Sequence, residues 1–356
     1  MPESAVRGPV HVIGAGLLGT SIGLALRRAG VEVWLSDVDD HHLRTAAGLG
    51  AGVPAPVGQG SPALVVVAVP PAAIAATVAR ALHSDAVVTD VGSVKGQPLD
   101  EVAALVDAEA LTRYVGSHPM AGSERSGPLA GSAVLFDGRP WAVTSHQTAA
   151  ADAVAAVEAL ADACGAVAVR MTPDQHDQAV ARTSHLPHLM AVLVAGQLAQ
   201  ADREQLALSG QGVRDVTRIA GGDPALWQQI ISGNAGAVRG LLDDVRTDLD
   251  TLIGALDDPS RLDVVLRRGV AGTRAIPGKH GGRPQEMASV YVSVPDHPGE
   301  LARLFSDVGE IGTNIEDIRI DHDPGRPVGL TELLVEAGAA DPLRDSLEAR
   351  NWVVHR

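Results

Sequence analysis

The sequence predicts an α/β protein of three domains: a doubly wound α/β domain, an all-α domain, and a ferredoxin-like α+β domain at the C-terminus. Three observations predict this architecture. β-type apolar runs alternate with helical patterns up to residue 172, only helical patterns occur in 173–275, and the order β-α-β-β-α-β appears in 287–356. A chain of 356 residues is long enough for two or three domains that each bury a core.

The first domain, residues 1–172, begins with a strand, a glycine turn and a helix. Val10 to Ile13 is an apolar β-type run, and the motif G-x-G-x-x-G follows it at residues 14–19. A second β-type run ends at Asp37. In a Rossmann-type site the glycines allow a tight turn, close approach of the pyrophosphate and helix packing, while the acid accepts hydrogen bonds from the ribose hydroxyls. This segment therefore predicts a dinucleotide-binding site.

The residues after this acid favour NAD over NADP. Asp39 and Asp40 would repel a 2'-phosphate, and the stretch contains no arginine to hold one. Cofactor contacts are expected from the glycine turn, from the acid and from the end of the third β-type run: Gly14, Gly16, Leu17, Leu18, Gly19, Asp37, Val69 and Pro70.

Strands and helices continue to alternate in the rest of the first domain, which predicts a doubly wound sheet. Ligands of such sheets bind beyond the carboxyl ends of the strands, and Ser93 and His118 both fall there. The expected β-type runs are 63–70, 86–96, 114–120, 139–145 and 166–172, with helices at 71–82, up to about 110, and at 148–163.

The remaining chain divides into a helical domain, a linker and a small α+β domain. Residues 173–275 contain helical patterns, including a long run over 235–256. By analogy with other Rossmann proteins, such a domain closes the substrate cleft and provides a dimer interface. Residues 276–286 are expected to be a linker, because their glycines and prolines interrupt any periodicity.

The composition excludes several classes of protein. An apolar fraction of 46% and a charged fraction of 20% are typical of a folded soluble chain, and no apolar run reaches the ~20 residues of a membrane helix. The net charge of −15, with only two Phe and two Tyr, argues against a nucleic-acid partner. A single cysteine and an N-terminus without an apolar signal segment predict a cytoplasmic location.

Five motifs resemble those of one enzyme family. GAGLLGTSIG, DVGSVKG, HPMAGSERSG, SHLPH and TRIAGGDPALWQQI, in this order, resemble the TyrA family of prephenate and arogenate dehydrogenases. The C-terminal domain resembles the ACT regulatory domain of one branch of that family. The resemblance implies NAD-dependent oxidative decarboxylation of prephenate to 4-hydroxyphenylpyruvate in tyrosine biosynthesis, with arogenate as the alternative substrate.

The same resemblance assigns roles to residues. Loss of a hydroxyl proton near pH 7 needs a neutral base, and histidine has a suitable pKa. His118 is implied as that base, and Ser93 as the residue that shares its hydrogen bond to the ring hydroxyl. Arg218 is implied to bind a substrate carboxylate, for which a bidentate guanidinium is suited. His185 and His188 are implied to lie beside the substrate; no third ligand of suitable spacing accompanies them, so no metal is predicted.

Several of these residues have a second interpretation. Arg218 could instead form a surface ion pair with Asp215 or Asp223. Glu124 and Arg125 either gate the cleft or belong to a solvated loop, and Lys95 has either a cofactor-side or a surface role. Trp227 either caps the pocket or belongs to the core or a dimer interface.

The resemblance to an ACT domain implies an effector site and an assembly. Gly299 and Asn314 mark the positions where such domains bind amino acids, usually between paired domains, and tyrosine is the expected effector. A homodimer is the expected assembly. Two other functions compete: a different NAD-dependent hydroxyacid dehydrogenase, which would lack HPMAGSE followed by SHLPH, and a noncatalytic sensor of NAD and an amino acid, which would leave His118, Ser93 and Arg218 unexplained.

Overall fold

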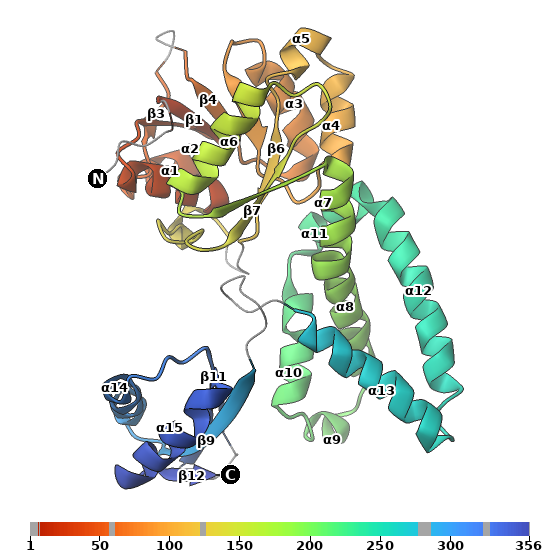
Figure 1. The fold of residues 1–356 in the computed structure, drawn as a ribbon. Coiled ribbons are helices and arrows are strands. Elements are labelled where there is room, and N and C mark those ends of the chain that lie inside the picture. Colours follow the sequence, from red (N-terminus) through yellow and green to blue (C-terminus); the bar gives the residue numbers. More distant parts are fainter. Residues whose placement is uncertain are drawn as a thin grey trace. The chain divides into compact units, whose positions relative to one another are not determined.

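The chain forms two compact units, Met1–Leu249 and Asp250–Arg356. The structure, a computed structural model, describes residues 6, 8–56, 61–121, 126–276, 286–322 and 328–355 (Figure 1). No helix in these described ranges is both long enough and apolar enough to span a membrane.

A five-stranded parallel sheet forms the centre of the N-terminal region, as the alternation predicts. Its strand order is β3-β2-β1-β4-β5, which matches the first five strands of the Rossmann order 3-2-1-4-5-6. Val10 and Val12 of β1 and the whole of β4 are buried, because helices cover both faces of a parallel sheet. The strands are β1 (Val10–Ile13), β2 (Val33–Ser36), β3 (Val53–Pro54), β4 (Leu64–Val67) and β5 (Val87–Asp90), and the helices are α1 (Leu17–Arg28), α2 (Asp40–Gly48), α3 (Pro71–Ala81), α4 (Gly96–Ala103) and α5 (Ala108–Leu111).

The predicted single doubly wound sheet is in fact divided. A separate three-stranded sheet holds β6 (Gly116–Pro119), β7 (Pro140–Thr144) and β8 (Val167–Met171), and β6 runs antiparallel to β7. In the described part of the chain, the backbone ladder between this segment and β5 is limited to an isolated bridge between Val88 and Tyr114. Side chains replace the ladder beyond that bridge, since Lys95 Nζ donates to the Ser117 carbonyl (2.6 Å) and Ser117 Oγ donates to the Asp90 carbonyl (2.9 Å). Helix α6 (Ala151–Ala163) connects β7 to β8.

Helices follow β8, as the sequence predicts. A threonine capping box begins α7 (Pro173–Val180), and a π-helical turn at Ala181–His185 connects it to α8 (Leu186–Leu198). Asp223 caps the helix that begins at Pro224, because its carboxylate accepts a hydrogen bond from Ala225 N. The further helices are α9 (Arg203–Leu206), α10 (Gln211–Thr217), a 3-10 turn at Arg218–Gly221, α11 (Pro224–Gly233), α12 (Ala235–Ile253) and α13 (Pro259–Arg274). Most of the predicted linker, residues 277–285, lies outside the described residues.

The C-terminal segment has the predicted β-α-β-β-α-β order. Its four strands form an antiparallel sheet in the order β10-β11-β9-β12, and its core includes Leu304, Leu343 and Trp352. The elements are β9 (Met287–Pro295), α14 (Glu300–Ile311), β10 (Asp317–His322), β11 (Val328–Glu336), α15 (Ala337–Ala349) and β12 (Val353–His355).

Candidate active site

The glycine turn between β1 and α1 has the shape that a dinucleotide requires. Gly14 has φ +104°, and a Cβ there would lie 2.2 Å from the Ala68 carbonyl oxygen; a Cβ on Gly19 would lie 1.8 Å from the Gly14 oxygen. A Cβ on Gly16, by contrast, would meet nothing within 4 Å. Packing therefore fixes the first and third glycines, whereas the second faces open space. Helix α1 also begins without a side-chain cap, so its first N–H groups are available to an anion.

Asp37 lies beside this turn, at the end of β2. Its carboxylate accepts hydrogen bonds from Ala15 N (2.5 Å) and Asp39 N (2.8 Å). The end of β4 borders the same turn, because Val69 N lies 3.2 Å from the Cβ position of Gly14, and the exposed Pro70 caps α3. These residues fit a pyrophosphate at α1 and a ribose at Asp37. The negative charge of Asp37 would repel the 2'-phosphate of NADP.

His118, near the end of β6, belongs to a hydrogen-bonded chain of three side chains. Its Nδ1 lies 2.9 Å from Nε2 of His176, and Nδ1 of His176 lies 2.8 Å from Oδ1 of Asp177. Both partners come from α7 and are buried. Burial, followed by the nearby charges of His176 and Lys95, lowers the pKa of His118 well below its ordinary 6.5. His118 is therefore a neutral imidazole at physiological pH, as a general base must be.

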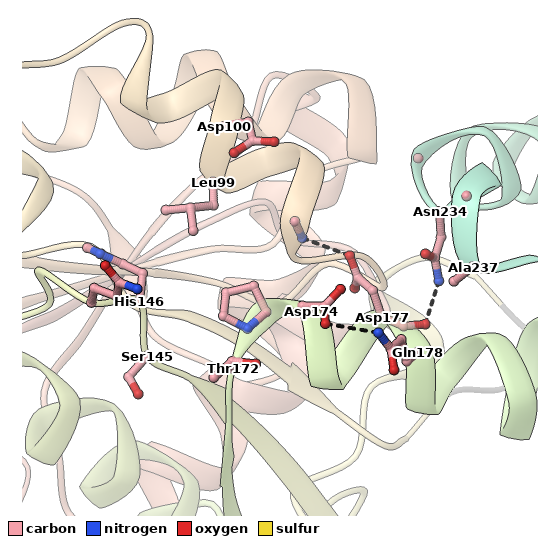
Figure 2. A pocket seen from close by; sticks show the side chains of 15 residues that line it. Leu99, Asp100, Ser145, His146, Thr172, Asp174, Asp177, Gln178, Asn234 and Ala237 are labelled. Atoms are coloured by element: carbon pink, nitrogen blue, oxygen red, sulfur yellow. Dashed lines mark hydrogen bonds between the residues drawn. The ribbon is translucent and has the colours of Figure 1, made fainter.

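Asp177 is held in place from several directions. It accepts from Lys95 N (2.9 Å) and Gly96 N (2.8 Å), and so provides the cap that α4 lacks locally. Asn234, just before α12, donates to the Asp177 carbonyl (2.7 Å) and approaches His185 Nδ1 (3.3 Å). Figure 2 shows Asp177 and Asn234 at the wall of a cavity of about 460 Å³.

A buried ion pair lies under β6. The Lys95 ammonium donates to Asp90 Oδ1, and Tyr114 OH donates to Asp90 Oδ2 (2.7 Å). Burial lowers the pKa of Lys95, and the Asp90 carboxylate opposes that shift. With 1% of its surface exposed, Lys95 has no surface role, which corrects one of the two interpretations of this residue.

His185 and His188 share a helix face as their spacing predicts, and both meet Trp227. The His188 ring stacks on the Trp227 ring with centroids 3.5 Å apart, and His185 meets it edge-on at 6.2 Å. Burial is the main reason that the pKa of His185 falls to about 4. Nδ1 of His188 is buried and has no hydrogen-bond partner among the described residues, although buried polar atoms normally have one.

The structure does not bring together every predicted residue. Ser93, after β5, is half-buried and lines a second cavity of about 650 Å³, but no hydrogen bond joins it to His118 within the described residues. Arg218 is exposed, and in the described part of the chain it forms no ion pair with Asp215 or Asp223. Glu124 lies outside the described residues, as does Arg125.

Sequence reasoning missed His176, Asp177 and Asn234. The His-Asp dipeptide follows the capping box of Thr172 and Gln175, so the sequence could predict that it lies in a helix. The sequence could not predict that His176 contacts His118, because His118 lies 58 residues away on another element.

Known proteins of one family resemble this chain over most of its length. The model of the prephenate dehydrogenase nucleotide-binding domain matches residues 22–170, and that of the prephenate dehydrogenase dimerization domain matches residues 172–265. A probable prephenate dehydrogenase of Streptomyces niveus is 37% identical over 357 residues, covering 96% of this chain and 98% of that protein.

Two solved structures extend the comparison. Prephenate dehydrogenase from Aquifex aeolicus, in complex with hydroxyphenyl propionate and NAD+, is 26% identical and has a TM-score of 0.67 over 76% of this chain and 99% of its own. Synechocystis arogenate dehydrogenase is 25% identical, with a TM-score of 0.64 over 74% and 98% of the two chains.

Proposed function

Because this chain belongs to the prephenate dehydrogenase family, we propose that it catalyses the NAD-dependent oxidative decarboxylation of prephenate to 4-hydroxyphenylpyruvate. The observation that carries this proposal is the half-buried, neutral His118, whose Nδ1 is engaged by His176 and whose Nε2 no hydrogen bond among the described residues engages. The glycine turn and Asp37 support NAD as the cofactor.

In this reaction His118 acts first as a base that takes the hydroxyl proton, and then as an acid that gives the same proton back to the ring oxygen. NAD, held at the glycine turn and Asp37, would supply the acceptor for the hydride of the ring carbon that bears the hydroxyl. His118 Nε2 takes the hydroxyl proton as that carbon becomes a carbonyl. When carbon dioxide leaves, its bonding electrons aromatise the ring, and the ring oxygen takes the proton back from His118. No proton is gained or lost overall, so His118 needs no exit route for it.

Cationic and polar side chains account for substrate binding. The guanidinium of Arg218 is exposed and forms no ion pair with the residues that the structure describes, so it is available to bind one carboxylate with two hydrogen bonds. His188, stacked on Trp227, is proposed to lie beside the substrate side chain, and His185 shares this aromatic support. Ser93 is proposed to contact the ring hydroxyl.

Rates of NADH formation with prephenate and arogenate, each offered with NAD and with NADP, test the proposal. We expect turnover of prephenate with NAD. The similarity to an arogenate dehydrogenase makes arogenate the second candidate, since the two acids differ only in a keto or amino group. Turnover of a simple hydroxyacid, with neither cyclohexadienyl substrate consumed, would contradict the assignment.

The domain roles follow from the same family. Residues 1–172 bind the cofactor, and residues 173–275 complete the substrate site and form a homodimer, joined by the linker 276–286 to the C-terminal domain. Helix α8 supports the dimer, because it is apolar on all sides whereas its Val192, Leu193 and Val194 are exposed in the single chain.

The C-terminal domain, 287–356, is proposed to be an ACT domain that binds tyrosine. Gly299, with φ +96°, begins α14, and the exposed Asn314 precedes β10, so both lie at strand–helix junctions. We expect tyrosine to inhibit the full chain, and Asn314→Ala to raise the inhibitory concentration about tenfold without changing the uninhibited rate, as one lost hydrogen bond would. If deletion of residues 287–356 leaves an enzyme that tyrosine still inhibits equally, the effector site lies elsewhere.

A further inference from the structure

We infer that His176 is a positioning residue that, held by Asp177, fixes the tautomer of His118 and shares its positive charge during turnover. This inference rests on the proposed function. It starts from the three-membered chain His118–His176–Asp177, which none of the predicted site residues except His118 belongs to.

The direction of the hydrogen bonds follows from the acceptor at the end of the chain. Asp177 already accepts from two backbone N–H groups, so its carboxylate is oriented to accept and not to donate. The proton between Asp177 and His176 is therefore on His176 Nδ1. This leaves a lone pair on His176 Nε2, which accepts a hydrogen bond from the N–H of His118 Nδ1.

This hydrogen-bonded series leaves the lone pair of His118 on Nε2, the ring nitrogen that has no hydrogen-bond partner among the described residues. Both imidazoles are thus Nδ1–H tautomers, whereas a histidine side chain free in water prefers the Nε2–H form. Without His176, most His118 rings would carry their proton on the nitrogen that must act as the base. Fixing the tautomer through a buried partner is the role that the aspartate of a Ser-His-Asp triad has for its histidine.

The same chain stabilises the charge that His118 acquires. When the substrate O–H bond breaks and the Nε2–H bond forms, the His118 imidazolium donates more strongly through Nδ1 to His176. The carboxylate of Asp177 offsets the charge, against the repulsion of the buried Lys95 ammonium. The charge disappears when the ring oxygen recovers the proton.

His176 does not itself touch the substrate. It is 1% exposed, and both of its ring nitrogens are occupied by Asp177 and His118. Its effect on the reaction must therefore pass through His118.

Two substitutions at this position separate the two hydrogen bonds. In His176→Asn the amide can replace Nδ1 and keep the bond to Asp177, but no acceptor reaches His118. In His176→Gln the longer side chain can place its oxygen where Nε2 was and accept from His118. We expect kcat with NAD and prephenate to fall about 10²- to 10⁴-fold in His176→Asn and only about tenfold in His176→Gln. KM for prephenate and Kd for NAD should change by less than about threefold in both, because neither ligand meets His176. Equal losses of kcat in the two variants, or losses that follow their thermal stabilities, would overturn the inference.

Nitrogen-15 NMR of histidine-labelled protein tests the tautomers without substrate. His118→Asn and His176→Asn assign the two sets of signals. We expect Nδ1–H forms of both residues in the wild type, and an Nε2–H form of His118 in His176→Asn. An Nε2–H form of His118 in the wild type would overturn the inference. A wild type that has the expected tautomers but does not turn over prephenate would instead overturn the proposed function.

Discussion

Replacing His118 by asparagine should lower kcat for prephenate oxidation by about 10²- to 10⁴-fold while NAD still binds. An asparagine amide can replace Nδ1 and donate to His176, so the buried hydrogen bond is preserved. It offers no basic nitrogen in place of Nε2, so the hydroxyl proton has no acceptor. The rate of NADH formation measures the loss, and quenching of tryptophan fluorescence by NAD measures retained binding. Retained kcat in this variant would exclude His118 as the base.

The pH dependence of the wild type tests the same base independently. His118 works only as a neutral imidazole, so kcat/KM should fall as the pH drops through its pKa. Burial and neighbouring positive charge move that pKa down from 6.5, and the acid limb of kcat/KM should accordingly lie below pH 6.5. A limb near pH 6.5 would mean that His118 is more solvated than the structure shows.

Lys95→Met should destabilise the N-terminal unit by about 3–5 kcal/mol, the usual cost of leaving one member of a buried ion pair alone. Lys95 and Asp90 are 1% and 0% exposed, and removal of the ammonium leaves the carboxylate with Tyr114 OH and Gly92 N as its remaining donors. Urea unfolding followed by circular dichroism measures the change in midpoint.

Two further variants control this experiment. Lys95→Met combined with Asp90→Asn removes both charges and should recover much of the loss, because no lone charge remains buried. Arg28→Met breaks an ion pair with Asp137 whose side chains are 41% and 45% exposed, and should cost no more than about 1 kcal/mol. A cost for Lys95→Met as small as that for Arg28→Met would show that water reaches Asp90.

Local features of this molecule could be predicted from the sequence, and long-range ones could not. The turn at Gly14 to Gly19 and the position of Asp37 depend on a strand, a helix and a strand that follow one another, so their spacing was sufficient. The stacking of His188 on Trp227 and the bond from His176 to His118 depend on how helices and strands from different parts of the chain pack, and no local pattern encodes this packing.

The division of the sheet has a similar origin. Residues 114–120 have the alternation of a strand, and the sequence correctly predicts that they form one. Which neighbour that strand pairs with is decided by Lys95, Asp90 and Ser117, whose side chains occupy the space between β5 and β6. A lysine in a glycine-bounded turn gives no sign that it will be buried.

The burial of Lys95 has a practical consequence for labelling. The chain has only two lysines, Lys95 and Lys279, and the native fold shields the amine of Lys95 from solvent and holds it in two hydrogen bonds. An acylating reagent can modify this amine only when the contact between β5 and β6 opens. The extent of acylation at Lys95, measured by peptide mass spectrometry, therefore reports how often the contact between β5 and β6 opens.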